Sequence, residues 1–291
     1  MTDDPFVTHR SLLFTVAYEM LGSAADAEDV LQESWLRWAD AAQEQVRDPR
    51  AYLVRIVTRQ ALNHLRTVSR RRESYVGEWL PEPLLTMPDV ADDVELAESV
   101  SIAMLTVLET LGPTERAVFV LREVFDVPYD EIAVAVDKSP AAVRQIAHRA
   151  KDHVAARRPR MEVERSEHAE AVERFVAALN TGDVQGLMDV LAPDVVSVAD
   201  GGGKVRGAAL RPIIGADRIA RYLVGGLAKY PGRYFAAPAW VNGQPGIRVE
   251  LDGRMAGVVS LSVEHGRITR IYSMANPEKL GWMGAAAELA R

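Results

Sequence analysis

The stretch 111-LGPTERAVFVLREVFDVPYDEIAVAVDKSPAAVRQIAHRAK-151 decides the fold of the middle of this chain. Its apolar spacing predicts a helix at 114–124, a short helix at 129–136, a turn at 137–139 and a last helix from Pro140. Ser139 is a good N-cap, and proline fits the first helical position. Two short helices joined by a three-residue turn predict a helix-turn-helix, whose second helix can enter the major groove of DNA.

The outer face of that last helix is basic. Val143, Ile146 and Ala150 are spaced to face inward, which leaves the cationic and amide side chains outside. Arg144 and Gln145 are residue types that pair with base edges, and the later cations suit phosphates. This face indicates DNA binding, with an ordinary helical hairpin and a solvated basic face as the alternative.

A second basic segment lies upstream, although the net charge of the chain is −7. Residues 50–72 (RAYLVRIVTRQALNHLRTVSRRR) hold seven arginines and no acid. Arginines interleaved with Tyr52, Gln60 and Asn63 on one helix suit DNA with unstacked bases. The alternative is a solvated amphipathic helix.

An acidic helix precedes this basic segment. Residues 1–49 hold ten acids and three bases, and the sequence AADAEDVLQESWLRWAD predicts a negative helix that bears tryptophan. Such a surface is unlike a DNA-binding face and suits a basic protein partner. The alternative is an acidic surface that only aids solubility.

The chain divides into domains by composition. Residues 5–73 and 96–158 have helical spacing, and residues 74–95 (SYVGEWLPEPLLTMPDVADDVE), with three prolines and a cluster of acids, read as a linker. From residue 165 two helices are followed by alternating strand-like runs, separated by turn signals such as Asn242-Gly243. The expected architecture is multidomain, with two all-α domains followed by an α+β domain at 165–291.

Composition excludes several classes of function. The 291 residues contain no cysteine, which excludes disulfides, Cys-zinc sites and thiol catalysis. No signal peptide and no apolar run of about 20 residues is present, so we expect a cytoplasmic protein without membrane contact. We expect no metal site and no cofactor.

These residues together resemble a known family. "ADAEDVLQESWLRW" followed by "PRAYLVRIVTRQALNHLR" is similar to the σ2 helical bundle of extracytoplasmic-function RNA polymerase sigma factors, and the stretch 111–151 is similar to their σ4 helix-turn-helix. "YVGEWLPEPL" in the linker, "DGGGK" (200–204) and "NPEKL" (276–280) resemble the motifs of a subgroup with a fused C-terminal SnoaL-like domain. Such domains have the NTF2-like cone fold, a curved sheet with helices that encloses a pocket.

The resemblance implies a function. A sigma factor binds core RNA polymerase, here through its β′ clamp helices and β flap, and directs promoter-specific transcription initiation without catalysis of its own. In the subgroup, the fused domain is thought to regulate the sigma factor in cis, without a separate anti-sigma factor. The activity expected here is therefore promoter recognition and melting.

The resemblance also implies positions for the sites. The polymerase-binding residues are Asp26, Glu28, Asp29, Gln32, Glu33 and Trp35. The residues near the −10 element are Arg59, Asn63, Arg66, Arg70, Arg71 and Arg72. The residues facing the −35 element are Ser139, Arg144, Gln145, His148, Arg149 and Lys151. The interdomain regulatory residues are Trp79, Leu80, Pro81, Asp200, Gly201, Gly202, Gly203, Lys204, Asn276, Pro277, Glu278 and Lys279.

Two positions depart from the family pattern. Asn63 stands where many relatives carry Asp, which bears on the preferred −10 sequence. Asp137 stands in the helix-turn-helix turn where Gly is common. Because Asp tolerates a left-handed backbone better than most residues, we expect the turn to be kept.

The glycine loop 199-ADGGGKVRG-207 does not match a nucleotide site. A P-loop needs G-x-x-x-x-G-K-[ST], but Val198 and Val205 occupy its first glycine and its hydroxyl position. We expect Asp200 and Lys204 to make polar contacts with the sigma half near the linker. The alternative is a C-terminal small-molecule sensor or SnoaL-like isomerase or hydrolase, for which Asp194, Asp200 and His265 are the available titratable groups.

Overall fold

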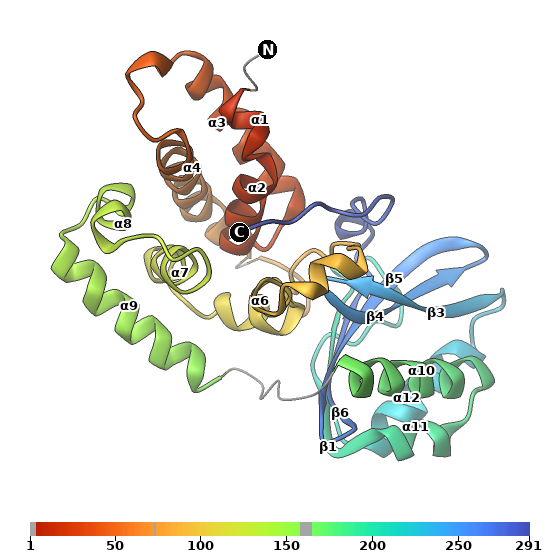
Figure 1. The fold of residues 1–291 in the computed structure, drawn as a ribbon. Coiled ribbons are helices and arrows are strands. Elements are labelled where there is room, and N and C mark those ends of the chain that lie inside the picture. The colour runs from red at the N-terminus through yellow and green to blue at the C-terminus, as the bar shows by residue number, and fades with distance from the viewer. Residues whose placement is uncertain (1–3, 73, 158–164) are drawn as a thin grey trace.

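The first half of the chain is helical in the computed structural model, which describes residues 4–72, 74–157 and 165–291 (Figure 1). The first helical domain, residues 5–72, consists of α1 (Pro5–Thr8), α2 (Arg10–Leu21), α3 (Ala24–Ala39), the short 3-10 helix η1 (Gln43–Gln45) and α4 (Pro49–Arg72). Ser23 caps α3 as its residue type predicts, because its Oγ accepts from the Asp26 N–H at 3.1 Å. Helices α2, α3 and α4 pack around a core that includes Tyr18 and Trp38.

The second helical domain, residues 96–157, contains the predicted helix-turn-helix. The linker and this domain contain η2 (Pro88–Asp92), α5 (Val94–Ser99), α6 (Ile102–Leu108), α7 (Pro113–Phe119), the π-helical turn η3 (Val120–Val124), α8 (Tyr129–Val136) and α9 (Pro140–Ala155). Asp137 ends α8 with a left-handed φ of 55°, and the Ser139 Oγ accepts from the Ala142 N–H to cap α9. Val143 and Ile146 are buried, as their spacing predicts.

The C-terminal domain, residues 165–291, is a mixed sheet with helices on one side. Its elements are α10 (Arg165–Thr181), α11 (Val184–Val190), β1 (Leu191–Asp200), β2 (Ile213–Ile214), α12 (Ala216–Ala228), β3 (Tyr234–Val241), β4 (Gln244–Leu251), β5 (Arg254–Glu264), β6 (Arg267–Met274) and η4 (Pro277–Lys279). The strand order in the described residues is β2-β1-β6-β5-β4-β3, and β1 and β6 are parallel while the other pairs are antiparallel. The three hairpin turns place Asn242, Asp252 and His265 at positive φ, which suits the following glycines.

The two faces of this sheet have different neighbours. Helices α10, α11 and α12 cover one face with an apolar core around Phe175, Ile219 and Ile271. Against the other face, Leu80 of the linker and Ile102 of α6 join residues of β5 and β6 in a separate cluster. The C-terminal domain is therefore packed onto the helical half of the chain.

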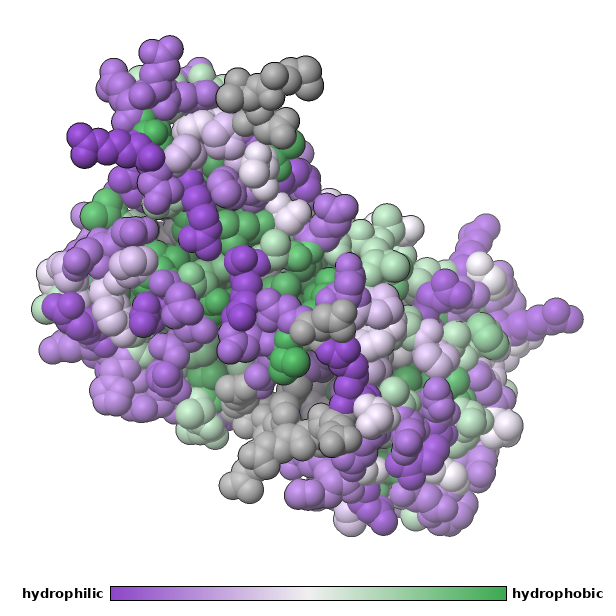
Figure 2. All heavy atoms as spheres, viewed as in Figure 1, coloured by the Kyte–Doolittle hydropathy of each residue, from purple (hydrophilic) through white to green (hydrophobic). Residues whose placement is uncertain are grey.

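The two helical domains share one apolar core. Buried residues of α2 and α4 belong to the same cluster as those of α7, α8 and α9, and Figure 2 shows hydrophobic residues gathered where the two domains meet. At the other end of the chain, the Ala290 N–H donates to the Thr15 Oγ of α2 at 3.1 Å. No helix among the described residues is long and apolar enough to span a bilayer.

Candidate polymerase and DNA interfaces and the domain junction

Helix α3 presents the acidic surface to solvent. Asp29, Gln32 and Glu33 are exposed, whereas Asp26 and Glu28 are half-buried. Within this acidic surface Trp35 is 46% exposed and the neighbouring Leu36 is 58% exposed.

Two of these carboxylates are positioned by other helices. The Arg10 guanidinium lies 2.7 Å from Glu28, and the Gln60 amide donates to Glu33 at 2.6 Å. An exposed tryptophan is typical of protein-binding surfaces, and the acids on the same helix suit a basic partner.

The arginine-bearing side of α4 lies against the second helical domain. Arg59, Asn63 and Arg66 are exposed on α4. The Arg59 Nη2 donates to the Val134 carbonyl of α8 at 2.8 Å, so part of this face is already engaged by α8. Arg70, Arg71 and Arg72 lie on the last turn of α4, and their side chains fall outside the described part of the structure.

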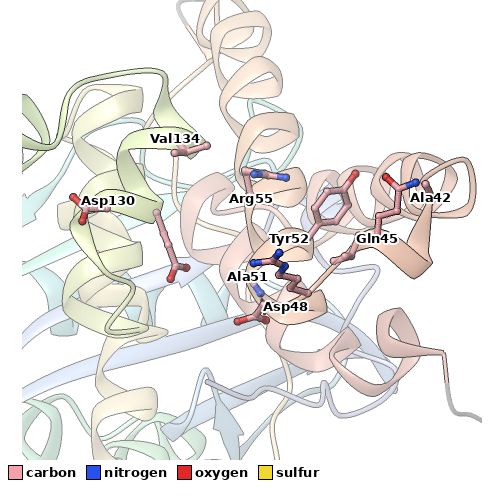
Figure 3. A pocket seen from close by; sticks show the side chains of 11 residues that line it. Ala42, Gln45, Asp48, Ala51, Tyr52, Arg55, Asp130 and Val134 are labelled. Atoms are coloured by element: carbon pink, nitrogen blue, oxygen red, sulfur yellow. Dashed lines mark hydrogen bonds between the residues drawn. The ribbon is translucent and has the colours of Figure 1, made fainter.

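A groove of about 690 Å³ lies between η1, the start of α4 and α8 (Figure 3). On one wall the Arg55 guanidinium lies 4.8 Å from the centre of the Tyr52 ring. Asp130 and Glu131 of α8 form the opposite wall. An aromatic ring beside a guanidinium suits a base out of its stack, whereas the facing carboxylates repel phosphate. The sequence gives no sign of this groove, because its walls come from two domains.

Helix α9 lies at the outer edge of the molecule with its polar face in solvent (Figure 1). Arg144, Gln145, His148 and Arg149 are all exposed, as is Lys151. Three of these five side chains also have partners. The Lys151 ammonium pairs with Glu123 at 2.6 Å, the His148 ring lies 3.7 Å from Asp152, and the Arg144 guanidinium lies 5.9 Å from the Tyr129 ring.

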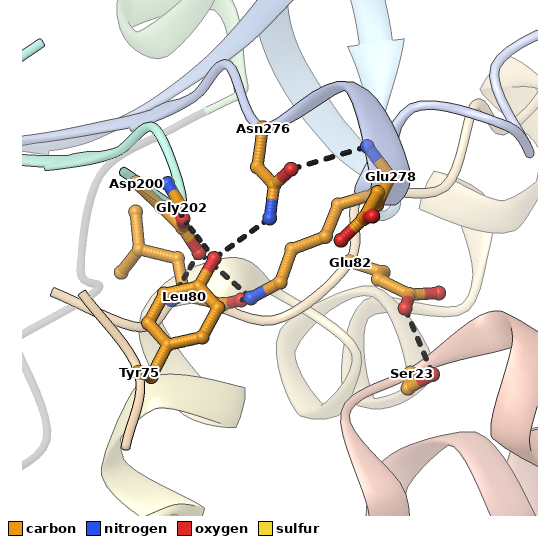
Figure 4. Close-up of polar contacts among 9 residues, drawn as sticks. Ser23, Tyr75, Leu80, Glu82, Asp200, Gly202, Asn276 and Glu278 are labelled. Atoms are coloured by element: carbon orange, nitrogen blue, oxygen red, sulfur yellow. Dashed lines mark hydrogen bonds and ion pairs between the residues drawn. The ribbon is translucent and has the colours of Figure 1, made fainter. Parts of the chain in front are cut away.

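Asp200, at the end of β1, is the centre of a buried junction with the linker (Figure 4). Its side chain is fully buried. One carboxylate oxygen accepts from the Tyr75 hydroxyl at 2.5 Å and the Gly202 N–H at 3.1 Å. The other accepts from the Leu80 N–H at 2.9 Å and the Lys279 ammonium at 2.7 Å. The carboxylate is thus satisfied by both the linker and its own domain.

Lys279 contacts Leu80, the linker residue whose N–H donates to Asp200. Its ammonium donates to the Leu80 carbonyl at 2.5 Å and lies 3.8 Å from the centre of the Trp79 ring. The Asn276 amide donates to the Tyr75 hydroxyl at 2.8 Å. Burial, followed by the hydrogen bond to Asp200, raises the pKa of Tyr75. "DGGGK" and "NPEKL" therefore meet at the linker.

The glycines of "DGGGK" allow close packing at this junction. Gly202 and Gly203 have positive φ. A Cβ at Gly202 would overlap the Asn276 amide, and a Cβ at Gly203 would lie 2.9 Å from the Cβ of Val76. Both positions therefore require glycine for conformation and for space.

Lys204 differs from the expectation. It forms an ion pair with Glu278 of its own domain rather than with the sigma half. Glu278 lies in η4, so the ion pair joins the glycine loop to η4.

Glu82 of the linker caps the acidic helix α3. Its buried carboxylate accepts from the Ser23 hydroxyl at 2.9 Å and from the N–H groups of Ala24 and Ala25 at 2.8 and 3.2 Å. Its carbonyl accepts from the Tyr18 hydroxyl at 2.6 Å. A carboxylate at a helix N-terminus stabilises the helix, so the linker supports the helix that carries the acidic surface.

Asn242 forms hydrogen bonds to three other segments of the chain, although the sequence indicates only a turn there. From the β3–β4 hairpin, its amide donates to the Tyr18 hydroxyl at 2.7 Å and the Val100 carbonyl at 2.8 Å. Its Oδ1 accepts from the Leu84 N–H at 2.9 Å. Its partners belong to the first helical domain, to the segment between α5 and α6, and to the linker.

Two buried ionisable groups lie between the helical domains. The Glu19 carboxyl accepts from the Ser99 hydroxyl at 2.7 Å, and burial raises the pKa of Glu19 to about 8. The Arg116 guanidinium donates to the Met20 carbonyl at 2.9 Å and pairs with Glu109 at 2.8 Å. Burial lowers the pKa of Arg116 to about 10, so it stays charged at neutral pH.

The three candidate catalytic groups of the C-terminal domain do not meet. Asp194 is exposed near the start of β1, and Asp200 is buried at the far end of the same strand. His265 is exposed in the β5–β6 turn. Among the described residues, no group of three or more His, Asp or Glu side chains is placed to hold a metal ion.

Comparisons with known proteins agree with this organisation. The family model of Sigma-70 region 2 matches residues 6–71, that of Sigma-70 region 4 matches residues 101–154, and that of the SnoaL-like domain matches residues 172–271. The chain is 38% identical to the ECF RNA polymerase sigma factor SigJ of Mycobacterium tuberculosis over 94% of this chain and 91% of that protein. It is 29% identical to the RNA polymerase sigma-E factor of Streptomyces coelicolor over 49% of this chain and 77% of that protein.

A solved structure shows the same arrangement. The crystal structure of the M. tuberculosis sigma factor SigJ superposes with a TM-score of 0.75 at 36% identity, covering 94% of this chain and 96% of that one. The fold class predicted from sequence is confirmed. The chain belongs to the extracytoplasmic-function family of RNA polymerase sigma factors and carries a C-terminal SnoaL-like domain.

Proposed function

We propose that this sigma factor directs promoter-specific initiation under control of its own C-terminal domain, which holds the linker and both helical domains in a closed arrangement. The observation that carries the proposal is the junction at Asp200, where one buried carboxylate and Lys279 grip the main chain of Leu80 from both sides. No separate anti-sigma factor is needed for this control, because the contacts come from the same chain.

The closed arrangement restricts the DNA-facing side of α4. Arg59 is held by the Val134 carbonyl, and Asp130 and Glu131 face Arg55 across the groove. A DNA phosphate entering this groove meets two carboxylates that must first move away. Release of the C-terminal domain therefore favours promoter binding by freeing the second helical domain.

The proposed contacts follow the exposed faces. The acidic face of α3, centred on Trp35, binds core RNA polymerase. Arg59, Asn63 and Arg66 bind near the −10 element, with Tyr52 and Arg55 stacking an unpaired base. The outer face of α9 binds the −35 element, where Arg144 and Gln145 read bases and the other cations position the helix.

We propose no catalytic role for the C-terminal domain. An apolar core fills its helix-covered face, and Asp194, Asp200 and His265 lie apart. Asp200, moreover, is fully used by the junction.

Transcription in vitro tests the proposal. Core polymerase is supplied with the full-length protein, with Asp200→Asn, or with a truncation after Pro159. We expect promoter-specific transcripts from the full-length protein and a several-fold increase from Asp200→Asn, because the junction opens. Asp252→Asn is the matched control, since Asp252 also accepts from a tyrosine hydroxyl and a backbone N–H but is exposed.

Two results would contradict the proposal. Absence of initiation with the full-length protein at every promoter tested would refute the sigma activity. Equal transcript from the wild type and Asp200→Asn would refute control through the junction.

A further inference from the structure

The C-terminal domain carries a third basic segment that neither the helical domains nor the junction explains. Residues 204–233 hold seven basic side chains and one acid, Asp217. These basic residues are Lys204, Arg206, Arg211, Arg218, Arg221, Lys229 and Arg233, and all of them are exposed. The two basic regions recognised from sequence, residues 50–72 and the helix that starts at Pro140, lie on α4 and α9.

Tyr222 joins the two elements that carry four of these arginines. Its hydroxyl donates to the Gly207 carbonyl at 2.8 Å and accepts from the Ala209 N–H at 3.0 Å, which fixes the loop before β2 on α12. The loop carries Arg206 and Arg211, and α12 carries Arg218 one turn before Tyr222 and Arg221 beside it. We call Arg206, Arg211, Arg218 and Arg221 the arginine patch.

The positive charge of the arginine patch is largely unneutralised. Asp217 pairs with Arg221 at 2.8 Å on the surface of α12. Within the described residues, the side chains of Arg206, Arg211 and Arg218 have no hydrogen bond or ion pair. Three exposed guanidinium groups without carboxylate partners attract a polyanion.

Helix α12, which carries Arg218 and Arg221, lies on the side of the domain away from the junction, whereas the loop that carries Arg206 and Arg211 also holds Leu210, which lies beside Gly77 of the linker. Helix α12 packs Ile219 and Ala220 into the core on the helix-covered face of the sheet, whereas the linker contacts the opposite face. Figure 1 shows α12 with α10 and α11 on the side of the sheet remote from α2 and α3. Arg218 and Arg221 are therefore not used to hold the closed arrangement, and no side-chain contact joins Arg206 or Arg211 to the linker among the described residues.

The outer face of α12 is also open to close approach. A Cβ at Gly225 or Gly226 would meet no heavy atom within 4 Å, so packing does not require these glycines. Each costs about 1 kcal/mol in a helix interior relative to alanine. Gly225 lies two turns after Arg218 and so shares its face, where a bare backbone lets a large partner approach.

We propose that the arginine patch binds the phosphate backbone of duplex promoter DNA, which makes the C-terminal domain a third DNA contact of the sigma factor. Arginine forks match phosphate oxygens and hold them bidentately. Duplex DNA is the polyanion that this chain meets if it acts as the sigma factor proposed above, on which this inference rests. Such contacts add affinity without reading sequence.

The test uses holoenzyme made from core polymerase and the full-length protein. Binding to a promoter duplex and to a duplex with scrambled −10 and −35 elements is measured between 50 and 200 mM salt. The patch variant is Arg206→Gln/Arg211→Gln/Arg218→Gln. The matched control, Arg174→Gln/Arg248→Gln/Arg254→Gln, removes the same charge from exposed arginines of the same domain outside the patch.

The expected result follows from counterion release. Each lost phosphate contact lowers the slope of log affinity against log salt by about 0.9, so three contacts lower it by about 2.7. The wild type then loses about 40-fold more affinity than the patch variant between 50 and 200 mM salt. The patch variant loses the same affinity on both duplexes. The control variant keeps the salt slope of the wild type, and the patch variant keeps the affinity of the wild type for core polymerase.

The inference is overturned if the patch variant and the control have the same salt slope. It is also overturned if the patch variant loses affinity for core polymerase instead, since the patch then binds an acidic protein surface. Failure of the proposed function is read separately, as absence of transcripts with the wild-type protein.

Discussion

Replacing Asp200 with asparagine should open the linker. The substitution removes the charge that Lys279 faces at 2.7 Å, and the lysine side chain is only 7% exposed. Breaking a buried ion pair by removing one partner costs about 3–5 kcal/mol, because an uncompensated charge stays buried. The Leu80 carbonyl and the Trp79 ring still stabilise the ammonium, so the lower value applies.

Hydrogen exchange measures this effect directly. The amides of Leu80 and Leu84 donate to Asp200 and Asn242, and that of Thr86 donates to the Trp240 carbonyl. A loss of about 3 kcal/mol in opening free energy speeds exchange of peptide 79–86 by about a hundredfold. The double variant Asp200→Asn/Lys279→Met should exchange more slowly than Asp200→Asn, because no charge is left unpaired.

Asp252→Asn again serves as the control and should leave exchange of this peptide unchanged. Exchange within threefold of the wild type in Asp200→Asn would refute the reasoning. A double variant that exchanges faster than Asp200→Asn would show that the lost charge is not the cause.

Three further predictions concern other contacts. Burial raises the pKa of Glu19 to about 8, so this group stabilises the fold fully below the ordinary carboxyl pKa and progressively less as the pH rises to 8. The melting temperature of Glu19→Gln minus that of the wild type should therefore increase between pH 5 and pH 8.5. A difference that stays constant would contradict this. Asn242→Ala leaves the Val100 carbonyl and the Leu84 N–H unsatisfied at about 1–3 kcal/mol each, while the Tyr18 hydroxyl keeps its bond to the Glu82 carbonyl. Chemical denaturation should therefore show a large loss of stability coupled to domain separation, whereas Asn180→Ala should weaken only the C-terminal domain. Arg144→Ala should cost holoenzyme about 1–3 kcal/mol on a matched −35 element and relax discrimination there, while an equal loss on all sequences would indicate a phosphate contact instead.

Local chemistry made much of the helical half predictable. Ser23 and Ser139 cap their helices by accepting from N–H groups three residues later. Both helix starts can therefore be predicted from a few consecutive residues. The hairpin turns at Asn242, Asp252 and His265 are equally local, because each precedes a glycine at positive φ.

Contacts between distant segments were harder to predict. The parallel pairing of β1 with β6 joins residues such as Asp200 and Met274, and no spacing in the sequence reveals it. Helix α12 was not predicted, although Ile219, Leu223, Val224 and Leu227 have the spacing of one helix face; Gly225 and Gly226 near its end made the segment resemble a loop. Asp200 makes polar contacts with the linker, where they were expected, whereas the ion pair of Lys204 and the contacts of Asn242 involve residues that lie far away in the sequence.

The contact between Lys279 and Leu80 also sets an order of events during synthesis, since the two residues are 199 positions apart. At about 5–20 residues per second, a ribosome needs roughly 10–40 s to reach Lys279 after it has passed Leu80. During that interval both helical domains have been made while the residues that restrain them have not. If the C-terminal domain restrains the sigma factor as proposed, each newly made molecule passes through a brief period in which it can bind polymerase before that domain has been made.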